Sequence, residues 1–144
     1  MSNEERQSWN QQIIEEFRAN AGSVEQFGGK GLLLLHHTGA KSGTPYVSPL
    51  AWISAPEGCW VIVASNAGRE NHPAWFHNLQ ANPETVIETP GDDEVQTVKV
   101  KARVAGDAER DALYAEVVAK APQFGEYQKG TSRRIPIVVL EPAA

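Results

Sequence analysis

Lys41 and Ser42 lie between two glycines, Gly39 and Gly43, and this spacing is typical of a turn that binds an anion. Glycine takes positive φ at little steric cost, so backbone N–H groups of such a turn can converge. Lys41 adds a full positive charge and Ser42 a hydroxyl donor. The Walker spacing of nucleotide triphosphate loops is absent, and the alternative is a surface turn with a solvated lysine.

The polar segment 65–71 is a second candidate for ligand binding. It reads Ser-Asn-Ala-Gly-Arg-Glu-Asn, follows an apolar run and leads to His72-Pro73, where a helix is expected to begin. The amide groups at a helix N-terminus favour negative charge, so this loop is suited to an anionic group. The alternative is an ordinary connection between a strand and a helix.

Other reactive side chains indicate less specific chemistry. Tyr127 lies in a polar stretch, where it is either a donor to a carbonyl or nitro group or a surface tyrosine. Cys59 is the only cysteine and lies in an apolar run, which favours packing over nucleophilic attack. The four histidines do not form a chelating pair on one element, so we expect no metal site. A GxSxG nucleophile motif is also absent, which disfavours a hydrolase.

The elements that position these residues follow from hydrophobic periodicity. Leu32 to Leu35, the glycine-flanked turn and an extended segment over 44–54 predict a β-hairpin. Trp9, Ile13 and Phe17 recur every four residues and predict an amphipathic helix within 1–22. Three roles are open for its apolar face: packing on the fold, covering a cofactor, or contacting a membrane. Further strands are expected at 59–65, 85–89, 95–104 and 135–140, and helices at 73–81, 107–121 and 124–129.

This order of elements predicts a single α+β domain over 1–144, with an antiparallel barrel of about six strands over 31–141. The net charge of −5 argues against a nucleic-acid partner, which requires a broad basic surface. Neither a long apolar run nor a signal-peptide pattern is present. We therefore expect a cytoplasmic protein, either free or peripheral to the inner face of the membrane. No oligomeric state is predicted.

Several collinear motifs over residues 27–142 resemble the deazaflavin-dependent nitroreductase family. They are Thr38-Gly39, Lys41-Ser42-Gly43, Pro49-Leu50, the VASNAG segment at 63–68, the HPAWFHNL segment at 72–79, Ala81-Asn82-Pro83 and the RIPIV segment at 134–138. The resemblance implies a split β-barrel related to oxidoreductases that bind flavin mononucleotide (FMN). It also implies coenzyme F420, an 8-hydroxy-5-deazaflavin, as the hydride donor to a small hydrophobic acceptor such as a quinone, a nitroaromatic compound or an activated alkene.

The same resemblance assigns roles to individual residues. Lys41, Ser42 and Gly43 would hold the phosphate and acidic tail of the coenzyme, and Tyr127 would lie against the substrate as the candidate catalytic residue. Trp75 would close the helix side of the site. The deazaflavin ring and its linker would be framed by the remaining cofactor-binding residues, namely Ser48, Pro49, Leu50, Ala64, Ser65, Asn66, Ala67, Gly68, Arg69 and Asn71.

The chain departs from these relatives at three positions. It has Tyr46 and Asn71 where relatives often have an arginine and a lysine, and Arg69 is a candidate replacement for the lost charge. Phe124 stands where some relatives have a second tyrosine. Three alternatives stay open: the same fold with FMN, a protein that binds the deazaflavin without turnover, and an unrelated small-ligand barrel.

Overall fold

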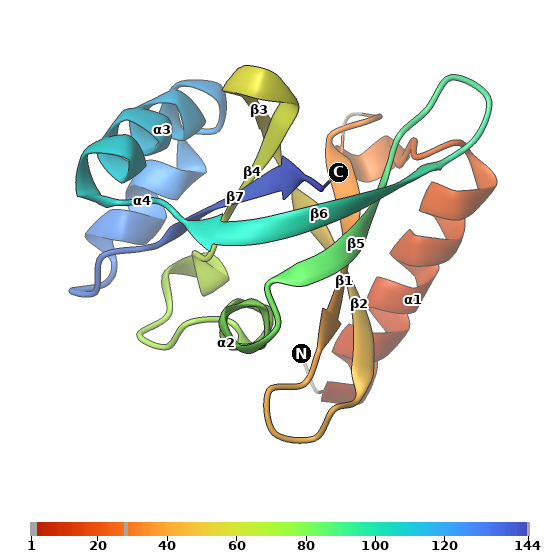
Figure 1. Ribbon diagram of the computed structural model, residues 1–144, viewed down its shortest axis with the longest axis horizontal. Coiled ribbons are helices and arrows are strands. Elements are labelled where there is room, and N and C mark those ends of the chain that lie inside the picture. The colour runs from red at the N-terminus through yellow and green to blue at the C-terminus, as the bar shows by residue number, and fades with distance from the viewer. Residues whose placement is uncertain (1–2, 28, 144) are drawn as a thin grey trace.

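A seven-stranded antiparallel sheet forms the centre of the protein in the computed structural model, which describes residues 3–27 and 29–143. The sheet curls strongly, and helices lie on both of its sides (Figure 1). The strand order is β2-β1-β5-β6-β7-β4-β3. The strands are β1 (Leu32–Thr38), β2 (Pro45–Ala51), β3 (Ile53–Ala55), β4 (Cys59–Val63), β5 (Glu84–Thr89), β6 (Gln96–Val104) and β7 (Ile137–Pro142).

The segment 44–54, which the sequence predicts to be one strand, is divided at Trp52 into β2 and β3. β2 pairs with β1 at one end of the sheet, whereas β3 pairs with β4 at the other end. One residue therefore connects the two edges, which requires the sheet to curl until these edges lie close together. This division accounts for the seventh strand.

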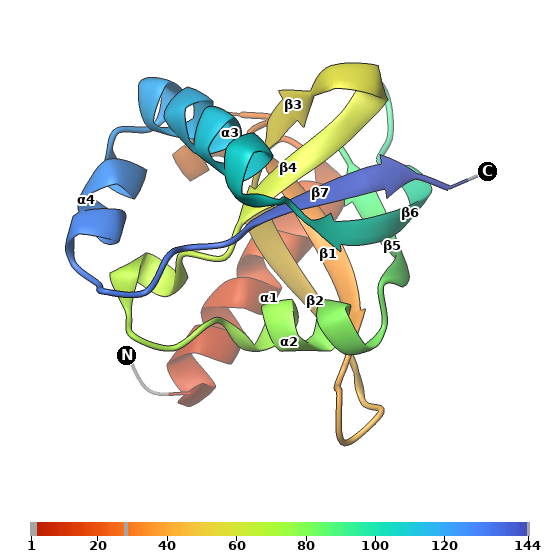
Figure 2. The same cartoon turned by 60° about the vertical axis from the view of Figure 1, so that its left-hand side comes forward.

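Four α-helices surround the sheet: α1 (Asn3–Ala19), α2 (Ala74–Ala81), α3 (Asp107–Lys120) and α4 (Gln123–Lys129). Short 3₁₀ turns occupy η1 (Glu25–Phe27), η2 (Pro56–Gly58) and η3 (Asn66–Gly68). α1 lies on the opposite side of the molecule from α3, and α2 lies near the β1–β2 hairpin (Figures 1 and 2). The predicted N-terminal helix is confirmed over 3–19, and its first two residues lie outside the described part of the chain.

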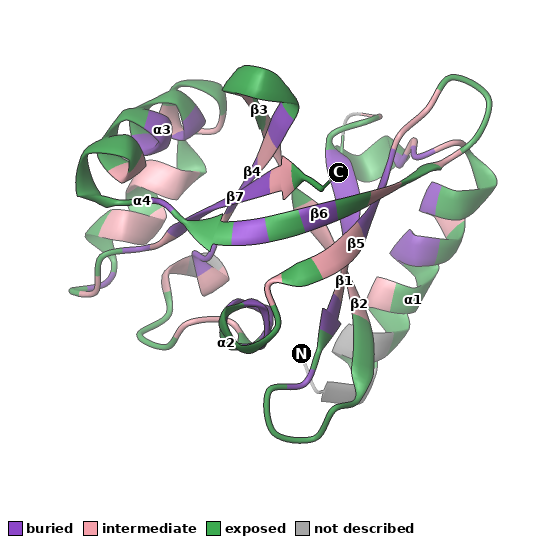
Figure 3. Cartoon of the chain, viewed as in Figure 1, coloured by how far each residue is buried: buried purple, intermediate pink, exposed green. Residues whose placement is uncertain are grey.

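β1 contributes to the core through both of its faces, as its continuous run of leucines requires (Figure 3). Leu33 and Leu35 pack inside the curled sheet, whereas Leu32 and Leu34 pack against Phe17 of α1. A separate core lies between α3 and the strands β4 and β7. Because β1 is fixed on both faces, the loop that follows it projects from a rigid base.

Candidate functional site

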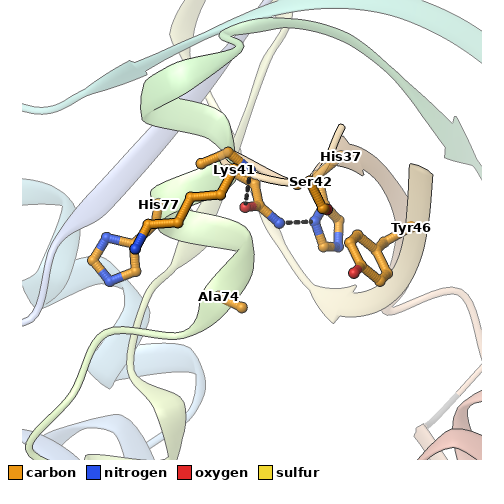
Figure 4. Close-up of a pocket in the computed structure, with 9 residues that line it drawn as sticks. His37, Lys41, Ser42, Tyr46, Ala74 and His77 are labelled. Atoms are coloured by element: carbon orange, nitrogen blue, oxygen red, sulfur yellow. Dashed lines mark hydrogen bonds between the residues drawn. The ribbon is translucent and has the colours of Figure 1, made fainter. Parts of the chain in front are cut away.

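A cavity of about 600 Å³ lies between the β1–β2 loop and α2, and we call it the tip cavity (Figure 4). Two of the predicted cofactor-binding residues, Lys41 and Ser42, contribute to its lining. The full lining is His37, Gly39, Ala40, Lys41, Ser42, Tyr46, Ala74, His77 and Asn78.

The two glycines of the loop serve different purposes. Gly43 has a φ of 71°, as expected for a left-handed turn position. Gly39 is not among the positive-φ glycines, so the expectation for this residue is wrong. A Cβ atom at Gly39 would collide with the Ser42 hydroxyl and would lie 3.4 Å from the ring of Tyr46. A larger residue than Gly39 would therefore displace the Ser42 side chain.

The backbone amides of the loop do not all converge on the cavity, because most are bonded within the protein. The Gly39 N–H donates to Thr44 O at 2.8 Å, and the Gly43 N–H donates to Gly39 O at 3.0 Å. The Thr44 N–H donates to Ser42 Oγ at 3.2 Å. Within the described chain, the N–H groups of Lys41 and Ser42 have no hydrogen-bond partner. These two amides are the loop's free donors.

Asn78 of α2 anchors the loop through a buried hydrogen-bond network. Its Oδ1 accepts a bond of 2.9 Å from the Ala40 N–H, so its Nδ2 donates to His37 Nδ1 at 2.9 Å. His37 therefore carries its proton on Nε2, which donates to Ser48 Oγ at 2.9 Å. Burial lowers the pKa of His37 to about 4, with a smaller effect from His36, so the ring is neutral near pH 7.

The tip cavity has a positive character although the protein is acidic. Its lining includes Lys41 and no carboxylate. No residue in the described part of the chain forms an ion pair with Lys41. The Lys41 side chain extends toward His77 across the cavity (Figure 4). An unpaired ammonium group beside two free amides is suited to bind an anion.

A second cavity, of about 190 Å³, is almost entirely apolar, and we call it the apolar cavity. Three predicted cofactor-binding residues, Pro49, Leu50 and Ser65, line it. The other lining residues are Trp9, Phe27, Leu32, Ala51, Val63 and Phe124. A neighbouring cavity of about 320 Å³ shares Phe27, Ala51, Val63 and Phe124 with it. This arrangement is suited to a flat aromatic or quinone-like group.

β2 connects the two cavities along an unpaired edge. It is the terminal strand of the sheet and pairs only with β1. Pro45 and Pro49 lack an N–H and are four residues apart, so both missing N–H groups fall on the same side of the strand, as expected where one edge makes no ladder bonds. The strand covers about 10 Å between Tyr46, in the tip cavity, and Pro49, in the apolar cavity. Its remaining backbone groups are available to a ligand.

The loop 65–71 contains η3 and packs against α4. Asn66 adopts a φ of 47° and Gly68 a φ of 80°. A Cβ atom at Gly68 would lie only 3.1 Å from Tyr127 O. The Asn66 Nδ2 donates to Asn71 O at 3.0 Å, which closes the loop. Arg69 is exposed, as the role of a replacement charge requires, but it does not line the tip cavity.

Several predicted site residues lie away from the two cavity linings. Trp75 and Ala64 are buried in the core inside the sheet. The ring of Tyr127 packs edge-on against Phe124 with the centroids 5.5 Å apart, so that Phe124 rather than Tyr127 reaches the apolar cavity. Ser48 contacts His37, and Gly43 shapes the loop. The Ala67 side chain is outside the described part of the structure.

Asn78 and His37 belong to the site but were not predicted from the sequence. Asn78 could have been found from the sequence, because it lies on the apolar helix face that Trp75, Phe76 and Leu79 form. A buried amide without a hydrogen-bond partner would destabilise the fold, so such a residue is expected to have one. His37 carried no comparable signal, because its role depends on contacts between β1, β2 and α2. The exposed aromatic pair Trp9 and Phe27 was not predicted either, because the two residues are far apart in the sequence.

The described residues form neither a metal-binding cluster nor a helix that could span a membrane. Within residues 3–27 and 29–143, no group of three histidine, cysteine, aspartate or glutamate side chains is arranged to hold a metal ion. In the same residues, no helix has the length and apolar character that crossing a bilayer requires.

A family profile and two curated relatives of this chain name the same activity. A profile of the F420H(2)-dependent quinone reductase family matches residues 9–142. F420H(2)-dependent quinone reductase Rv1261c of Mycobacterium tuberculosis is 38% identical over 110 residues, covering 75% of this chain and 71% of the relative. Rv3178 of the same organism, named for the same activity, is 36% identical over 110 residues, covering 76% of this chain and 88% of the relative.

The fold also matches a solved F420-H2 dependent reductase, FDR-A. The two structures superpose with a TM-score of 0.66 at 33% sequence identity, covering 77% of this chain and 94% of that chain. The α+β split-barrel fold implied by the sequence resemblance is confirmed.

Proposed function

The chain belongs to the F420H(2)-dependent quinone reductase family, and from this we propose that it transfers a hydride from reduced F420 to a quinone. In the overall reaction, F420H2 and a quinone give oxidised F420 and a hydroquinone. Nitroaromatic compounds and activated alkenes are further candidate acceptors, because they are also electron-poor and flat. The curated relatives carry only the quinone activity in their names.

The observation that best supports this proposal is that β2 connects the tip cavity, which contains the Lys41 ammonium group, to the apolar cavity. F420 has the matching chemistry, with an anionic phosphate and acidic tail at one end and a flat ring system at the other. Lys41 and the N–H groups of Lys41 and Ser42 would hold the anionic part. Pro49, Leu50 and Ser65 would frame the ring, where reduced F420 supplies the hydride.

The protein's own contribution is positioning and the exclusion of water. The apolar lining around Phe27 and Phe124 removes water from the acceptor and keeps it close to the ring. Backbone N–H groups of the loop at Ser65 and Asn66 are candidates to stabilise negative charge on the acceptor oxygen. Tyr127 would support Phe124 from behind through their edge-on contact, in addition to its proposed place beside the substrate.

The cofactor separates this proposal from its first alternative, an FMN-dependent reductase of the same fold. FMN also presents a phosphate to Lys41, but it lacks the acidic tail of F420. We therefore expect saturable quenching of F420 fluorescence on titration with the purified protein, and at least tenfold weaker binding of FMN. Exclusive binding of FMN would move the chain to the flavin-dependent proteins, and binding of neither cofactor would refute the proposed site.

A further inference from the structure

The Arg133 guanidinium donates its hydrogen bonds to a single loop. Its Nε donates to Arg69 O at 2.8 Å, its Nη2 donates to Ser65 O at 2.8 Å, and its Nη1 donates to Ala64 O at 3.2 Å. Nη1 also donates to His72 Nδ1 at 3.0 Å. These contacts join residues from both ends of the segment 64–72. Arg133 therefore fixes the shape of this loop.

The charge of Arg133 is not neutralised by a carboxylate. Among the residues that the structure describes, none forms an ion pair with it. Its fourth partner, His72, accepts through Nδ1 and is therefore a neutral ring with its proton on Nε2. Burial, and secondarily the positive charge of Arg133, lower the pKa of His72. The four acceptors that this half-buried guanidinium contacts are neutral, so its positive charge acts on the loop without an ion pair among the described residues.

Because of the backbone geometry, the peptide groups that Arg133 contacts present their N–H groups on the opposite side of the loop. All described peptide bonds are trans, so the N–H of a residue points away from the carbonyl that precedes it. Because the carbonyls of Ala64 and Ser65 face Arg133, the N–H groups of Ser65 and Asn66 face the opposite side. In the described chain neither amide has a hydrogen-bond partner.

The two free amides also belong to a conformation that brings amides together. Ser65 has right-handed helical angles, with φ −75° and ψ −33°, whereas Asn66 has a left-handed φ of 47°. A right-handed residue followed by a left-handed one makes successive N–H groups converge on a single acceptor, which is typically anionic. Ser65 lines the apolar cavity, so the first residue of this donor pair lies at its border.

We propose that Arg133 is a positioning residue that holds the amides of Ser65 and Asn66 toward an acceptor oxygen that becomes negative during reduction. This inference rests on the proposed reductase function. Arg133 does not touch the acceptor. It fixes the loop through three carbonyl groups. Its positive charge also stabilises a partial negative charge on an acceptor oxygen that lies on the opposite side of the same peptide groups.

Arg134 provides a matched control, because it adjoins Arg133 in sequence and has a different environment. It is exposed and pairs with two carboxylates of α3, Asp111 at 2.5 Å and Asp107 at 3.8 Å. It forms no hydrogen bond or ion pair with the loop 64–72 in the described structure. Replacing Arg134 therefore removes the same kind of side chain and leaves the loop unchanged.

The test compares Arg133→Gln, Arg133→Lys and Arg134→Gln in steady-state oxidation of F420H2 by a quinone. We expect kcat to fall about 100-fold in both Arg133 variants, because a small displacement of the donors is costly to the transition state. Binding of F420 should change less than about threefold, since its tail is held at the tip cavity. Arg134→Gln should stay within about twofold of the parent protein in both quantities.

A second readout separates this inference from the proposed function. Amide hydrogen exchange at Gly68 and Arg69, whose N–H groups donate to Ser65 O and Asn66 O within the loop, should be at least tenfold faster in Arg133→Lys than in Arg134→Gln, whether or not a quinone is reduced. Equal exchange in these two variants would overturn the inference. It would also be overturned by an Arg133 variant with kcat within threefold of the parent, or by equal losses of kcat and F420 affinity. Absence of turnover in the parent protein would refute the function alone.

Discussion

His37 shows how one residue links the core of the protein to its binding loop. It lies on β1, is 7% exposed, and has both ring nitrogens bonded to neutral groups. The ring of Tyr46 stacks over it with the centroids 5.5 Å apart. Protonation at Nδ1 would place a hydrogen against the Asn78 amide that now donates to this atom. The loop geometry therefore depends on a neutral His37.

This dependence predicts a stability change in mild acid. The pKa of His37 is about 4 in the folded protein, against 6.5 for the free side chain, so the unfolded chain binds the proton more readily. Stability is then complete above pH 6.5 and declines as the pH falls toward 4, by about 3 kcal/mol from this residue. Chemical denaturation at pH 4 and pH 7 should show a smaller decline for His37→Gln, which keeps one donor and one acceptor.

Exposed His77 provides the control for this measurement, since it lines the same cavity without the buried bonds of His37. The variant His77→Gln should retain the full decline of the parent protein. If His37→Gln and the parent lost the same free energy of unfolding between pH 7 and pH 4, a neutral buried His37 would not be the cause.

Lys41 leads to a prediction about affinity. Its charge has no ion-pair partner within the described residues, so a bound anion would interact with it without competition. Lys41→Ala should raise the Kd of F420 at least tenfold, because a charge-assisted contact is lost, and should leave kcat at saturating F420 nearly unchanged. Fluorescence titration at low and high salt provides the measurement, with the exposed strand residue Lys99→Ala as control. An unchanged Kd would remove Lys41 from the site.

At the scale of elements, α1 is fixed to the sheet by a core contact and a charged contact. Phe17 is fully buried against Leu32 and Leu34 of β1. The next residue, Arg18, donates two hydrogen bonds to the buried carboxylate of Glu88, at 3.0 and 2.7 Å. His36 Nε2 lies 2.7 Å from the same carboxylate. α1 is therefore an integral layer that presents Trp9 to the apolar cavity.

Replacing Phe17 by alanine tests this integration. The cavity left behind should lower the free energy of unfolding by about 3–5 kcal/mol. Phe27→Ala makes the same chemical change at a residue that is 39% exposed, and it should cost about 1 kcal/mol or less. Urea denaturation of both variants measures the difference. Similar losses in the two variants would mean that α1 is not part of the cooperative fold.

The elements were more predictable from the sequence than the links between them. Periodicity identified α1, and the alternation in β6 identified a strand with one buried face, because these patterns are local. The division at Trp52 has no local signal, since it arises when β3 finds its partner β4 at the far edge of the sheet. The network around Asn78 depends in the same way on contacts between distant segments.

At the scale of the whole molecule, the property most important for the proposed function is the combination of a positive tip cavity with an apolar cavity. The resemblance to known reductases correctly implied the family and the split barrel. Its residue assignments remain predictions, and the structure distributes these residues among the two cavities, the core, the loop 65–71 and α4. Charge and composition alone could not reveal a local positive site in a protein of net charge −5. That site exists because Lys41, beside α2, has no ion-pair partner among the residues that the structure describes.

The most direct test of the central claim is to follow the absorbance of F420H2 in the presence of menadione and a catalytic amount of the protein. The account predicts many turnovers per protein molecule, well above the rate without protein, and no comparable oxidation of reduced FMN. Saturable binding of F420 together with a rate equal to that without protein would contradict it. The chain would then be a protein that holds the deazaflavin without using it.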